Sequence, residues 1–126
     1  MKTPHQYTSQ LAELGLDQIV VEGVTGAEAQ QALARLAEIH SHLKDLETSL
    51  NLDMHALRSQ YQGRIAALSI TAHHKSRSEE EQRVTEERDA KLAPFEEVKT
   101  QLQGLLAALE EKRAALEKDA TDGLAP

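Results

Sequence analysis

The sequence predicts an all-α protein, an antiparallel helical hairpin of the coiled-coil type preceded by a short N-terminal helix and an extended segment. Hydrophobic residues make up 40% of the 126 residues but aromatic residues only 2%, so the core must be aliphatic, as in a helical bundle. Apolar residues on both sides of a polar middle recur at spacings of three and four, which places them on one helix face. Reflection about residue 76 superposes these residues in pairs: Leu36 on Leu116, Leu43 on Leu109, Leu46 on Leu106, Leu50 on Leu102, Met54 on Val98, Leu57 on Phe95 and Leu68 on Val84.

Residues 1–25 form the first predicted unit. Thr3 is a typical helix cap, Pro4 suits the first helical position, and Gly15 marks the end of a helix of two or three turns. Residues 16–24 then contain a β-branched cluster between glycines, which fits either a short strand or an extended segment lying on an apolar surface.

The first long helix is predicted over residues 26–72. Thr25 and Glu28 have the spacing of a capping box, in which the cap hydroxyl and the glutamate satisfy backbone N–H groups reciprocally. Residues 26–119 are expected to form the hairpin. The apolar stripe of its first helix is Ala29, Ala32, Leu36, Ile39, Leu43, Leu46, Leu50, Met54, Leu57, Tyr61, Ile65 and Leu68.

The polar residues 73–78 predict the turn, and a second capping box at Ser78 and Glu81 predicts that the second long helix spans residues 79–119. Pro94 should kink this helix, because proline cannot donate to the carbonyl one turn earlier; the alternative is a separate third helix that starts at Pro94. Residues 120–126 are expected to be a frayed tail. The apolar seam of the second helix is Phe95, Val98, Leu102, Leu105, Leu109 and Leu116.

The hairpin alone buries too little apolar surface to offset its conformational entropy. Near its open end the stripe widens, with Leu33 beside Leu36 and Leu105 beside Leu106, which indicates a second contact face. The N-terminal segment or a second hairpin could cover that face. We expect both, in a homodimer whose hairpins form a four-helix bundle, and Lys112 within the seam would fix its register.

Composition and motifs favour a protein that is not an enzyme. Two long helices with few aromatic residues offer little material for a catalytic pocket, so we expect no small-molecule substrate and no cofactor. The chain has no cysteine, and Glu38, His40 and His42 lack the spacings of helical metal sites, so we expect no metal. No secretion signal or membrane-spanning run is apparent, which predicts a cytoplasmic protein.

The net charge of −7 argues against general nucleic-acid binding, but residues 54–78 contain no acidic residue. The basic residues towards this end form a candidate binding tip for an anion or a partner: Arg58, Arg64, His73, His74, Lys75 and Arg77. The expected function is a coiled-coil interaction or scaffold protein that self-associates and presents this tip to a protein partner. The alternatives are a module that binds nucleic acid or an anionic membrane through the tip, and a holdase similar to prefoldin, although no strand-forming run separates the two helices as it does in prefoldin.

Overall fold

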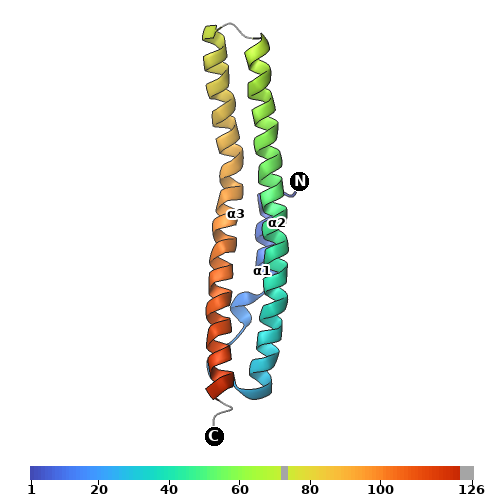
Figure 1. Ribbon diagram of the computed structural model, residues 1–126, viewed down its shortest axis with the longest axis vertical. Helices are drawn as coiled ribbons and strands as arrows, with labels where there is room; N and C mark the ends of the chain where they lie inside the picture. The colour runs from blue at the N-terminus through green and yellow to red at the C-terminus, as the bar shows by residue number, and fades with distance from the viewer. Residues whose placement is uncertain (72–73, 123–126) are drawn as a thin grey trace.

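A computed structural model describes the backbone of residues 1–71 and 74–122, and the side chains of residues 1–68 and 78–118. Helices α2 (Gly26–Thr71) and α3 (His74–Asp122) are antiparallel and lie side by side along their length (Figure 1). Helix α1 (Pro4–Glu13) and the short 3-10 helix η1 (Leu16–Gln18) lie against the half of the hairpin where α2 begins, which we call the base. The predicted all-α hairpin is thus confirmed.

The beginning and end of α1 follow from local chemistry. The Thr3 Oγ1 accepts from the Gln6 backbone N–H at 3.2 Å, and the Gln6 side-chain oxygen accepts from the Thr3 N–H at 2.8 Å. These two bonds make a capping box, with Pro4 at the first turn. Gly15 follows with φ 67°, a left-handed conformation that favours glycine and ends the helix. The predicted N-terminal helix is confirmed.

The segment after Gly15 is not a strand. Leu16 is buried at the start of η1, Ile19 is extended with φ −81° and ψ 112°, and no residue of the described chain belongs to a β-strand. The strand interpretation of residues 16–24 is therefore wrong, and the extended one applies only after η1. The physical reason is that a lone strand has no pairing partner, whereas a 3-10 turn satisfies its own backbone and buries Leu16.

Helix α2 begins at Gly26, as predicted, but α3 begins at His74, five residues before the predicted start at Glu79. The predicted turn over residues 73–78 is thus wrong for residues 74–78, while residue 73 lies outside the described residues. No glycine or proline occurs in 74–78, so regular helical hydrogen bonds can extend through Ser78. Likewise residues 120–122 belong to α3 rather than to a frayed tail, and 123–126 lie outside the described residues.

Helix α3 continues through Pro94 as one element, so the alternative of a third long helix starting there is wrong. Pro94 is exposed, whereas its neighbour Phe95 is buried in the hairpin core. Packing of the seam on both sides of the proline supports continuation of the helix despite the missing hydrogen bond. A kink at this position remains a prediction.

The core is one continuous cluster along the hairpin, and it also includes the N-terminal segment. Of the predicted seam in α3, every member is buried except Leu105, which is half-buried. The N-terminal segment adds Tyr7, Leu11 and Leu16. The full cluster of buried residues is Tyr7, Leu11, Leu16, Ala29, Leu36, Ile39, Leu43, Leu46, Leu50, Met54, Leu57, Tyr61, Val84, Leu92, Phe95, Val98, Leu102, Leu109 and Leu116.

Candidate functional site

The described residues of the predicted basic tip lie at different levels of the hairpin. His73 lies outside the described residues, and His74, Lys75 and Arg77 belong to the beginning of α3, with side chains outside the described part. Arg64 and Arg58 precede the end of α2 by 7 and 13 residues, which at 1.5 Å per residue places them roughly 10 and 20 Å down the helix. The tip is thus spread along the hairpin.

Arg58 and Arg64 both form ion pairs across the hairpin. Arg58 lies 3.8 Å from Glu96, and Arg64 lies 3.2 Å from Glu87, each joining α2 to α3. The Arg64 guanidinium also lies over the Tyr61 ring, 5.1 Å from its centroid. Each of the two arginines thus has an acidic partner on the other helix, whereas the side chains of His73, His74, Lys75 and Arg77 lie outside the described part. An anion site formed by those four residues remains a prediction.

A polar cluster joins α1 to the middle of α2. The Tyr7 hydroxyl donates to Asp53 Oδ2 at 2.5 Å and lies 2.9 Å from Ser49 Oγ, while the Lys2 backbone N–H donates to the same Asp53 oxygen at 3.2 Å. Burial and then the hydrogen bond to Asp53 raise the pKa of Tyr7 to about 12. Tyr7 is therefore protonated at neutral pH, and it serves as a donor that holds α1 in place.

The same tyrosine also contributes apolar contact. Its ring meets Phe95 of α3 edge to face, with centroids 6.4 Å apart, and Lys2 Nζ lies 5.6 Å from the Tyr7 ring centroid. Further along the segment, Leu11 and Leu16 are buried. Tyr7 thus links α1 to both long helices.

A second polar contact holds the segment near the base. Lys112 Nζ on α3 donates to the Ile19 carbonyl oxygen at 2.8 Å. This bond satisfies a backbone carbonyl just after η1 and gives the seam lysine a partner within its own chain. Sequence reasoning missed this role of Lys112, as it missed Lys2, Tyr7, Ser49 and Asp53, since their partners are distant in the sequence. The one available signal was the spacing of Tyr7 and Leu11, which places both on one face of α1.

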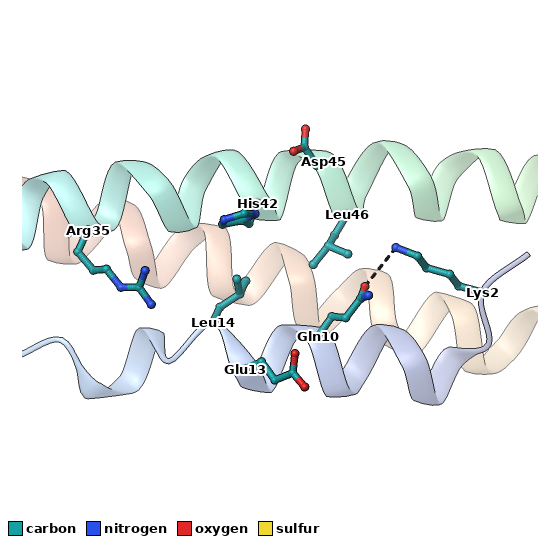
Figure 2. A pocket seen from close by; sticks show the side chains of 8 residues that line it. All are labelled: Lys2, Gln10, Glu13, Leu14, Arg35, His42, Asp45 and Leu46. Carbon is teal, nitrogen blue, oxygen red and sulfur yellow. Dashed lines mark hydrogen bonds between the residues drawn. The ribbon is translucent and has the colours of Figure 1, made fainter.

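An open groove of about 460 Å³ lies between α1 and α2 (Figure 2). Leu14 and Leu46 supply its apolar surface, and Lys2 Nζ donates to Gln10 Oε1 at 3.2 Å at one end. The Asp45 side chain points away from α1. Charges of both signs line the groove, so no single ligand charge is favoured. The lining residues are Lys2, Gln10, Glu13, Leu14, Arg35, His42, Asp45 and Leu46.

The other side of the hairpin carries two further hollows. One, of about 300 Å³, lies near the base and includes Leu33 and His40; the other, of about 570 Å³, lies nearer the turn and includes Arg58 and Ile65. Because successive helical residues differ by about 100°, these four residues share one face of α2, and His42 lies about 200° from His40. The hairpin therefore has one side covered by α1 and a second side without that cover, which we call the open face.

Within the described residues, no group of three histidine, cysteine or acidic side chains is placed to hold a metal ion. Nor does this part of the chain contain a helix long and apolar enough to cross a bilayer. A scan against protein-family models found no match, and searches of curated proteins and of solved structures found no similar chain.

Proposed function

We propose that the protein is a non-enzymatic, cytoplasmic interaction scaffold that self-associates as a homodimer and presents its basic hairpin tip to a protein partner. The observation that carries the proposal is the unequal covering of the hairpin seam. The N-terminal segment covers one side, while Leu33, Ile65 and Leu106 are half-buried on or beside the open face. Half-buried apolar side chains on an uncovered side are typical of helices that pack against further helices.

Two copies that pack through their open faces would form a four-helix bundle with coiled-coil packing. A two-fold dimer uses the same surface on both chains, so each half-buried leucine would meet its counterpart region on the other copy. Burial of this surface would offset the small core of a single hairpin. The N-terminal segments would remain on the outer sides of the bundle.

The direct test is the molar mass in solution, measured by light scattering over a range of protein concentrations. We expect a dimer for the native chain and a monomer of unchanged helicity for the double variant Leu33→Glu, Leu106→Glu, because charge on the open face opposes its burial. Leu52→Glu is the matched control, since Leu52 is 64% exposed in the monomer. A native chain that is monomeric at every concentration would refute the proposal.

The role of the tip has a separate test. We expect Lys75→Glu together with Arg77→Glu to abolish capture of the protein partner without changing the dimer. Arg83→Glu is the control, because Arg83 is also an exposed arginine of α3 but lies beyond the tip, where it pairs with Glu80. Equal capture by the native chain and the tip variant would refute this part of the proposal.

A further inference from the structure

His40 is a titratable side chain within the open face. It lines the hollow near the base, where its other neighbours include Leu36 and Leu109, both 0% exposed. Among the histidines whose side chains are described, His40 is the only one that is half-buried. The exposed ones are His5, His42 and His55. The His40 ring therefore lies against the hairpin core, on the side that α1 leaves uncovered.

Two half-buried leucines bracket His40 along the open face. Leu33 precedes His40 by 7 residues in α2, which places it roughly 10 Å nearer the base. On α3, Arg113 lines the same hollow as His40, and Leu106 precedes Arg113 by 7 residues. Because α3 runs towards the base, Leu106 lies roughly 10 Å nearer the turn than Arg113. A second copy that covers both leucines must therefore also cover His40.

The charged groups near His40 are already paired with one another. Across the hollow, Arg113 Nε lies 3.2 Å from Glu117 Oε1. One turn further along α2, Lys44 Nζ lies 3.5 Å from Glu47 Oε1. Within the described residues, the His40 ring has neither a hydrogen bond nor an ion pair. A proton added to this ring would thus introduce a charge that has no partner in the hairpin.

We propose that His40 makes self-association depend on pH, so that two copies pair through their open faces while its imidazole is neutral and separate when it is protonated. The inference rests on the proposed homodimer and adds its regulation. Burial without a partner disfavours the charged form of an imidazole. A two-fold interface buries the same residue on both chains, so two protons oppose each association. Histidine changes its charge between about pH 8 and about pH 5, so the dimer dissociates as the pH falls through this range.

The dissociation constant of the dimer tests the proposal, measured by sedimentation of the native full-length chain at about pH 7.5 and about pH 5.5. We expect it to rise by at least about tenfold at the lower pH, because both imidazoles must lose a proton before the chains pair. Circular dichroism at both pH values monitors the helicity and so distinguishes dissociation from unfolding. A rise that occurs only with loss of helicity would contradict the proposal.

Variants at residue 40 assign the effect to this ring. His40→Gln keeps a polar side chain that cannot gain a charge, and its dissociation constants at the two pH values should agree within about twofold. His40→Lys is charged at both pH values and should weaken the dimer already at about pH 7.5. His42→Gln is the matched control and should respond to pH like the native chain, because His42 lies in the groove beside α1 on the other side of α2 (Figure 2).

The outcomes separate this inference from the proposed function. A native dimer with the same dissociation constant at both pH values would overturn the role of His40 and leave the proposed scaffold intact. The same holds if His40→Gln responds to pH as strongly as the native chain, since all other histidines are unchanged in that variant. A native chain that is monomeric at both pH values would overturn the inference together with the proposed homodimer.

Discussion

Tyr7 shows how one side chain can decide the position of a whole segment. It is fully buried, its ring contacts Phe95 of α3, and its hydroxyl binds Asp53 and Ser49 of α2. A buried hydroxyl is tolerated only when it has hydrogen-bond partners, and here a carboxylate provides one of them. Tyr7 therefore contributes both burial and a specific polar contact that a leucine could not make.

The elevated pKa of Tyr7 gives a pH prediction. Because the pKa rises from 10.0 in the reference state to about 12 in the folded protein, the stabilisation is complete below about pH 10 and is lost as pH rises from about 10 to about 12. The free energy of unfolding should fall by about 3 kcal/mol more in the native chain than in Tyr7→Phe over this window.

Urea unfolding followed by circular dichroism, at several pH values, measures this difference. At neutral pH, Tyr7→Phe should cost about 2 kcal/mol, because the hydrogen bond to a carboxylate is lost. Tyr61→Phe is the control and should retain the native pH dependence. If Tyr7→Phe and the native chain lose stability in parallel above pH 10, the Tyr7 hydroxyl does not hold α1 in the way described.

Within a single helix, residues close together in the sequence differ sharply in burial. Leu50 of α2 is 0% exposed, whereas Leu52, two residues later, is 64% exposed. Helical geometry explains the contrast, since two residues correspond to about 200° around the axis. The two leucines therefore form a matched pair for measuring how much the seam stabilises the hairpin.

We expect Leu50→Ala to lower the free energy of unfolding by about 3 kcal/mol, through lost burial and the cavity that remains. Leu52→Ala should change it by less than about 0.5 kcal/mol, as is usual for exposed sites. Denaturant unfolding of both variants measures the two changes in the free energy of unfolding. Similar losses from the two substitutions would mean that the buried seam of α2 has been misassigned.

Pro94 lies inside α3 and interrupts the backbone hydrogen bonding of that helix. It is exposed and lies within the helix, so its replacement removes no core contact. Pro94→Ala should raise the free energy of unfolding by about 1–3 kcal/mol, because alanine restores a backbone hydrogen bond and removes the ring clash. Thermal and urea unfolding measure the gain, and Ala93→Ser, next to it on an exposed position, controls for substitution itself. A loss of stability would show that the proline shapes the seam.

The whole molecule is an elongated hairpin whose length is set by its helices. Helix α3 has 49 residues, which corresponds to about 74 Å at 1.5 Å per residue. The proposed dimer, packed through the open faces, would add width rather than length. We therefore expect a maximum dimension in small-angle X-ray scattering of about 75–90 Å for the dimer. The double variant Leu33→Glu, Leu106→Glu, which we expect to be a monomer, serves as the comparison, and a dimer nearly twice as long would contradict side-by-side packing.

Local patterns in the sequence were sufficient to predict most of the fold. Thr3 and Pro4 predicted the beginning of α1, and Gly15 its end, because caps and left-handed turns depend on a few neighbouring residues. The spacing of the leucines predicted which faces of α2 and α3 are buried. The beginning of α3 was predicted too late, because a capping box at Ser78 is a permitted start and the residues before it can also be helical.

The contacts of the candidate site were harder to predict from the sequence. The contact between Tyr7 and Asp53 joins residues 46 apart, and that between Lys112 and Ile19 joins residues 93 apart, so no local pattern marks either. Arg58 and Arg64 looked like parts of a basic tip because acidic residues are missing nearby in the sequence. Their partners Glu96 and Glu87 come from the other helix, and only the folded hairpin brings them close.

The sequence by itself determined that this chain is a helical hairpin and which faces of its long helices meet, because helical periodicity is encoded over a few residues. The tertiary structure alone decided that the N-terminal segment closes one side of the seam, and that Arg58 and Arg64 pair with glutamates of the other helix. Those outcomes depend on distances between residues far apart in the chain, which are fixed only when the long helices pack together.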